Sequence, residues 1–134
     1  MLLSPVFFPD LPESLVVRIF DLRMSHSIPE RDWKVFRELR QIALERLCDK
    51  ILAEAKGEIE RTDRSSHEKY LSLYKLIEKR DDDIARGFND FRRSTALMQI
   101  GIIHSMGLFT GEELRRFSPE TLRVIELYGP IPDA

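Results

Sequence analysis

Histidine and cysteine, the side chains best suited to metal binding and nucleophilic catalysis near neutral pH, are few and scattered in this chain. The histidines are His26, His67 and His104, and no two have the i, i+4 spacing that places two ligands on one helical face. The single cysteine, Cys48, lies in an apolar run, where a free thiol usually packs as a small hydrophobic group. We therefore expect no catalytic residue, no metal site, no cofactor and no enzymatic activity. The alternative is an enzyme in which His26 and His104 meet in a polar pocket.

Three adjacent aspartates, Asp81 to Asp83, form an acidic run. Successive residues of a helix point about 100° apart, so three neighbouring carboxylates of one helix cannot converge on a single ion. Asp81 falls on the same helical face as nearby apolar residues. We expect it to pair with Lys50 or Arg46 of a neighbouring helix and to fix the register of the two helices.

The densest polar group lies in FNDFRRSTALMQ, residues 88–99. Two adjacent arginines beside hydrogen-bonding side chains can bind a carboxylate or a phosphate through paired hydrogen bonds. A smaller basic group follows at Arg115, Arg116 and Arg123. The competing interpretation is a solvated helix face with ordinary ion pairs. The candidate interaction surface consists of Asn89, Asp90, Arg92, Arg93, Gln99, Arg115 and Arg116.

Apolar residues recur at steps of three and four between Tyr70 and Ser105. This spacing places them on one stripe of a helix, and such a stripe needs a partner helix to cover it. We call this stripe the seam and expect it to be a dimer or helix-packing contact. Its members are Tyr70, Tyr74, Ile77, Ile84, Phe88, Phe91, Met98 and Ile102.

Capping signals predict two long helices that form an antiparallel hairpin. Ser27, Pro29 and Glu30 predict a start near residue 28, and apolar spacing continues to Ile59. After a polar break, Ser65 and Glu68 form a second capping box. We expect the second helix to continue to Ser105, although Gly87 costs it ~1 kcal/mol. The alternative is a break within residues 81–87.

Two short helices are predicted near the C-terminus. Gly107 is expected to end the second helix, Thr110 and Glu113 form a third capping box, and Ser118–Pro119 starts the last helix. The segment GLFTGEEL, residues 107–114, resembles the turn and helix of the short C-terminal modules called SHOCT. We derive no function from this resemblance, which covers eight residues.

Composition limits the protein class. The chain has 134 residues, 43% of them hydrophobic and 33% charged, with a net charge of −2. These values are typical of one globular domain and disfavour a broad nucleic-acid-binding surface. The N-terminal segment has no basic leader and is interrupted by Pro5, Pro9 and Pro12, which argues against a secretory signal. We expect a cytoplasmic protein that does not enter the membrane.

The predicted architecture is all-α. Residues 28–134 form one helical domain, and residues 1–27 form an N-terminal arm that is either irregular and flexible or a short strand. Because the hairpin leaves wide apolar stripes uncovered, we expect a homodimer, most simply a helical bundle of the coiled-coil type. The predicted function is a self-associating protein–protein interaction or regulatory module, with another protein as a further partner. The alternative is a nucleic-acid-associated factor that uses a local arginine-rich face.

Overall fold

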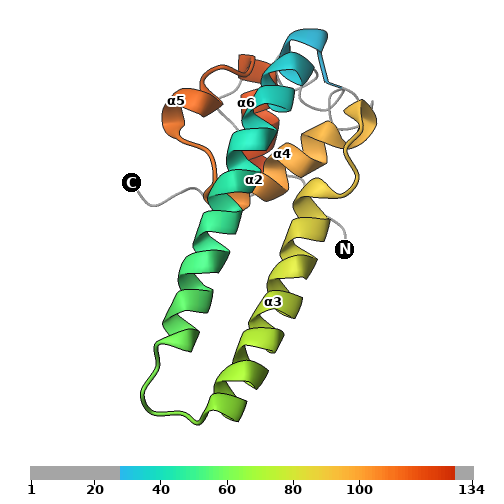
Figure 1. Cartoon of the computed structure of the whole chain (residues 1–134). Helices are drawn as coiled ribbons and strands as arrows, with labels where there is room; N and C mark the ends of the chain where they lie inside the picture. Colours follow the sequence, from blue (N-terminus) through green and yellow to red (C-terminus); the bar gives the residue numbers. More distant parts are fainter. Residues whose placement is uncertain (1–27, 129–134) are drawn as a thin grey trace.

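The computed structural model describes residues 28–128, which form a head and a projecting pair of helices (Figure 1). Within this range there are five α-helices, one 3-10 helix and no strand. The all-α prediction is confirmed for this part of the chain, and the N-terminal arm predicted for residues 1–27 lies outside it. The elements are α2 (Glu30–Ile59), α3 (Ser66–Phe88), η1 (Arg93–Thr95), α4 (Ala96–Ser105), α5 (Gly111–Leu114) and α6 (Pro119–Tyr128).

Helices α2 and α3 lie side by side and run in opposite directions (Figure 1). The Ser65 capping box starts α3 as predicted: the Glu68 amide donates to Ser65 Oγ at 3.2 Å, and the Ser65 amide donates to Glu68 Oε1 at 3.0 Å. Helix α2 begins at Glu30, with Pro29 as an N-cap that makes no side-chain hydrogen bond. We call residues 48–84 the stalk, and residues 28–47 with 85–128 the head.

The second long helix is shorter than predicted. It is continuous through residues 81–87, as expected, but it ends at Phe88 rather than at Ser105. Thr95 accounts for the break, because its Oγ1 donates to the carbonyl of Asp90 at 2.5 Å and accepts from the Arg92 amide at 3.3 Å. A threonine side chain that bonds the backbone in this way favours a turn over a helix. The chain then reverses through η1, and α4 folds back into the head.

Helix α4 lies at the centre of the head, in contact with α2, α3 and α6. The buried side chains of the protein gather around it, and their removal from water is the main favourable term in folding. At ten residues α4 is short, and no helix within residues 28–128 has the length and hydropathy needed to cross a membrane. The fully buried core residues include Ile28, Phe36, Leu39, Ala43, Ala96, Ile100, Ile103, Leu108, Val124 and Ile125.

The C-terminal stop and start signals form as predicted. Gly107 adopts a φ of 73°, its amide donates to the carbonyl of His104, and the next amide, of Leu108, donates to the carbonyl of Ile103. This left-handed ending satisfies the last carbonyls of α4 and buries Leu108 against the core. Thr110 and Glu113 then form the third capping box and start α5.

Candidate interaction surface

One side of the stalk carries large apolar side chains that the protein leaves uncovered. Tyr70, Tyr74 and Ile77 follow one another at helical spacing along α3, and Leu52 and Ile59 are two turns apart on α2. Their exposed fractions range from 48% for Ile77 to 65% for Leu52. Leu52 and Ile77 line the same hollow, so the two sets share one side of the stalk. We call these five residues the stalk face.

The seam does not pack against α2, because α3 is rotated so that a neighbouring stripe of its residues faces α2. The half-buried residues of that stripe include Leu73, Leu76 and Arg80. The seam residues Tyr70 and Tyr74 are therefore left in solvent. Beyond the stalk the seam is divided by the break after α3: Phe88 is buried, Ile84 and Ile102 are half-buried, and Phe91 and Met98 are exposed.

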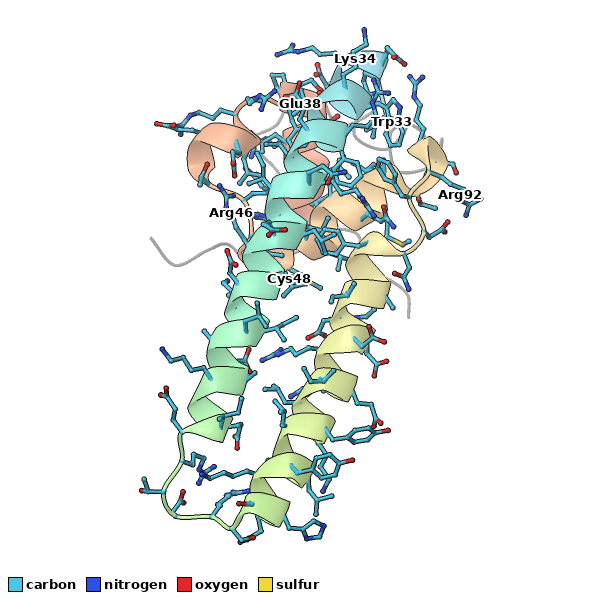
Figure 2. The ribbon with its side chains drawn as sticks, in the orientation of Figure 1. Trp33, Lys34, Glu38, Arg46, Cys48 and Arg92 are labelled. Atoms are coloured by element: carbon cyan, nitrogen blue, oxygen red, sulfur yellow. The ribbon has the colours of Figure 1, made fainter. Side chains whose placement is uncertain are left out.

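A hollow of about 360 Å³ opens between α2 and α3 at the end of the stalk nearest the head. Most of its wall is apolar, and Cys48 lies on its α2 side, at the upper end of the stalk in Figure 2. Two charged residues, Arg80 and Asp81, also line it. The full lining is Cys48, Ile51, Leu52, Ile77, Arg80, Asp81 and Ile84.

Arg80 bridges the two helices at this hollow. Its guanidinium donates to Glu54 of α2 at 2.9 Å and to Asp83 at 3.0 Å, and these two hydrogen bonds raise the pKa of Arg80. Its Nε, by contrast, is buried without a hydrogen-bond partner. This atom is shielded from solvent, and the exposed lining of the hollow is almost entirely apolar.

In the described part of the chain, Asp81 forms an ion pair with neither of its expected partners, Arg46 and Lys50. Arg46 binds Glu113 of the head through two hydrogen bonds of 2.6 and 3.0 Å, and it donates to the carbonyl of Leu108 at 2.8 Å. Figure 2 shows Arg46 on the side of α2 that faces α5. Within residues 28–128 no ion pair joins Asp81 to Lys50, and Asp81 is an exposed residue beside the hollow.

The histidines and Cys48 are not brought together. His104 is buried in α4, and burial lowers its pKa against a smaller opposing effect of the Glu126 carboxylate. His67 is exposed at the start of α3, at the opposite end of the stalk, and His26 lies outside the described residues. Among residues 28–128 no three His, Cys, Asp or Glu side chains are grouped to hold a metal ion.

The predicted arginine surface does not form one patch. Arg92 pairs with Asp90 at 2.7 Å on one side of the head, whereas Arg115 and Arg116 follow α5 on the other side (Figures 1 and 2). Gln99 is only 1% exposed in the centre of the head, so it cannot contribute to a surface. Asn89 is exposed at the end of α3.

Two of the remaining arginines are already paired. Arg93 donates to the carbonyl of Ile28 at 2.9 and 3.1 Å and forms an ion pair with Glu30 at 2.7 Å. Arg116 forms an ion pair with Glu38 of α2. These contacts connect the C-terminal part of the chain to the start of α2, which is a structural role.

Sequence reasoning missed Asp32, a fully buried carboxylate near the start of α2. It accepts hydrogen bonds from the Ser118 amide at 2.8 Å, the Ser118 hydroxyl at 2.7 Å and the Thr121 hydroxyl at 2.5 Å. Asp32 thus caps the start of α6 from another helix. The sequence around Asp32 does not predict this capping role, because Ser118 and Thr121 are 86 or more residues away along the chain.

Comparisons of the chain with models of known protein families, with curated proteins and with solved structures found no match.

Proposed function

We propose that this protein is a non-enzymatic interaction module that self-associates through the stalk face, most simply as a homodimer. The observation that carries the proposal is the set of large apolar side chains exposed together on one side of the stalk. Contiguous apolar surface of this kind usually marks a contact with another protein. A symmetric dimer covers the same patch on both partners at once.

Contacts within the protomer support this role by keeping the stalk rigid. Arg80 connects α3 to Glu54 of α2 inside the stalk, and the buried Phe88 anchors the end of α3 in the core. A rigid patch loses less conformational entropy on association than a flexible one. A regulatory role, in which dimerisation controls access of another protein to the stalk face, is consistent with the same geometry.

The alternative function, a nucleic-acid-associated factor, has weaker support. Nucleic-acid binding depends on cations that can neutralise phosphates. Arg92, Arg93 and Arg116 each lie against a carboxylate of this chain, and the net charge is −2. A local arginine-rich face would have to break these ion pairs before it could bind phosphate.

Light scattering on two matched variants tests the proposal. Ile77→Glu places a charge in the stalk face and is expected to convert the dimer into a monomer at micromolar concentration. Lys79→Glu also places a glutamate on α3, about 200° around the helix from Ile77, and is expected to leave the dimer intact. Two variants with equal masses would contradict the proposal.

Nucleic-acid retention at low salt separates the two functions. The proposed module is expected to show none, with or without charge reversal at Arg92 and Arg93. Retention that decreases steeply with salt and disappears in the charge-reversed variant would favour the alternative instead.

A further inference from the structure

The first three turns of α2 carry a group of cations that form no ion pair within the described part of the chain. Arg31, Lys34 and Arg37 are exposed and follow one another three residues apart. This spacing places them on the outward side of the helix, away from the core residues Phe36 and Leu39. We call these three residues the basic face.

The carboxylates of the same turns are already engaged. Glu30 pairs with Arg93, and Glu38 pairs with Arg116. Asp32 is buried beneath the helix, where it caps the start of α6. Because each exposed carboxylate of these turns is matched by an arginine from the C-terminal part of the chain, the charges of the basic face are left uncompensated.

The uncompensated cations weaken the helix that carries them. Neighbouring like charges on one side of a helix repel each other, and cations in its first turns oppose the helix dipole. No hydrogen bond or ion pair within residues 28–128 offsets this cost for Arg31 or Lys34. A local arrangement that disfavours folding without a structural gain is typical of a functional surface.

Arg37 is held beside an aromatic stack. Its guanidinium lies 5.9 Å from the centre of the Trp33 ring, and Trp33 packs on Phe91 with ring centres 5.0 Å apart. A cation–π contact restrains the arginine side chain but leaves its N–H groups able to donate. Phe91 is 38% exposed and Trp33 is half-buried, so the stack also presents apolar surface to solvent.

An acidic protein segment matches this surface better than a nucleic acid does. A guanidinium binds a carboxylate through two parallel hydrogen bonds, and the neighbouring Trp33 ring can cover an apolar side chain. The basic face extends over only about 9 Å of the helix. It can therefore neutralise few phosphates, and the affinity of a protein for nucleic acid depends on their number.

We propose that the basic face binds an acidic segment of another protein, with Arg37 bonded to a carboxylate and an apolar side chain of the segment packed on Trp33. Figure 2 shows Trp33 and Lys34 at the end of the head farthest from the stalk. The contact is thus separate from the stalk face and does not depend on the proposed self-association.

Binding of a synthetic peptide to the full-length chain tests the proposal. The probe is a fluorescein-labelled peptide of aspartate and glutamate with one central leucine, followed by fluorescence anisotropy at low salt. The wild type is expected to bind it. The variant with Arg31→Glu, Lys34→Glu and Arg37→Glu is expected to bind it at least about tenfold more weakly. A wild-type protein that does not bind the peptide would overturn the proposal.

The matched control reverses three exposed cations of the stalk. The variant with Lys50→Glu, Lys75→Glu and Lys79→Glu has the same net charge as the basic-face variant and is expected to keep the wild-type affinity. Equal losses in the two variants would overturn the proposal, because binding would then follow net charge alone.

Trp33 reports the apolar contact, because it is the only tryptophan of the chain. Unlabelled peptide is expected to shift its emission to shorter wavelength as the ring is covered, and a peptide with glycine in place of leucine is expected not to. Binding of the leucine peptide without a shift would overturn the contact with Trp33.

Two further measurements separate this proposal from the others. A single-stranded oligonucleotide that displaces the peptide at equal concentration would overturn it in favour of nucleic-acid binding. In light scattering the basic-face variant is expected to have the same mass as the wild type, and a change of mass would contradict the separation of the two surfaces. A wild-type monomer that binds the peptide would support this proposal and overturn self-association alone.

Discussion

At the scale of single residues, buried polar groups decide how the head is assembled. Asp32 connects the first turn of α2 to the start of α6 by three hydrogen bonds, and its carboxylate is inaccessible to solvent. Removing a buried acceptor leaves its donors without partners, which is more damaging than the loss of the bonds themselves. The stability of the head therefore depends on this one side chain more than on any of its surface ion pairs.

Replacing Asp32 by alanine should be strongly destabilising. The Ser118 amide and two hydroxyls lose their acceptor inside the head, so Asp32→Ala is expected to lower the free energy of unfolding by about 2–4 kcal/mol in urea titrations. Asp82→Ala is the matched control, because Asp82 is exposed on α3, and its effect should stay within about 0.5 kcal/mol. Equal effects of the two variants would contradict the capping role of Asp32.

His104 should make the stability of the protein depend on pH. Burial lowers the pKa of His104, so the unfolded chain binds a proton there as the pH decreases through about 6.5, whereas the folded protein binds it only at a lower pH. Stability then decreases with decreasing pH in this range. His104→Gln is expected to lose less stability than the wild type between about pH 7 and pH 5.5. A His104→Gln stability profile parallel to that of the wild type would be the contrary result.

At the scale of elements, two glycines in different backbone settings should respond to alanine in opposite directions. Gly57 lies inside α2 with no atom within 4 Å of an added Cβ, so Gly57→Ala is expected to stabilise the protein by about 0.5–1 kcal/mol. Gly107 has a φ of +73°, so Gly107→Ala is expected to destabilise it by about 1 kcal/mol. Thermal unfolding followed by circular dichroism measures both, and shifts of the same sign would be inconsistent with this account.

Local signals predicted the helices well where the deciding contacts are close in sequence. The capping boxes at Ser65 and Thr110 and the stop at Gly107 each depend on neighbours within five residues, and all three form. The end of α3 at Phe88 was missed because apolar spacing continues past it in the same phase. The break depends on Thr95 bonding to the backbone of residues 90–92, which periodicity alone does not reveal.

The candidate surface was predicted less well, because side-chain exposure depends on which stripe of a helix meets its neighbour. The seam residues Tyr70, Tyr74 and Ile77 were identified, but their exposure follows from the rotation of α3 relative to α2. Gln99 belongs to the predicted surface because it is polar and lies close in sequence to Arg92 and Arg93, but α4 folds back into the head and buries it. The hollow between α2 and α3 is a tertiary feature with no sequence pattern of its own.

At the scale of the whole molecule, the head and the stalk have different tasks. The head contains nearly all of the buried core and fixes the end of each stalk helix, whereas the stalk exposes its largest apolar side chains to solvent. A monomer would leave that surface in water, and a dimer removes it from two chains at once. Because association stabilises the folded state by mass action, the melting temperature is expected to rise with protein concentration.

Sedimentation equilibrium of the full-length chain tests self-association most directly. At micromolar concentration we expect a mass of twice the 15.7 kDa of one chain, decreasing toward a single chain on dilution. A well-folded protein that remains at 15.7 kDa over the same concentration range would contradict the central claim that the stalk face is a self-association surface.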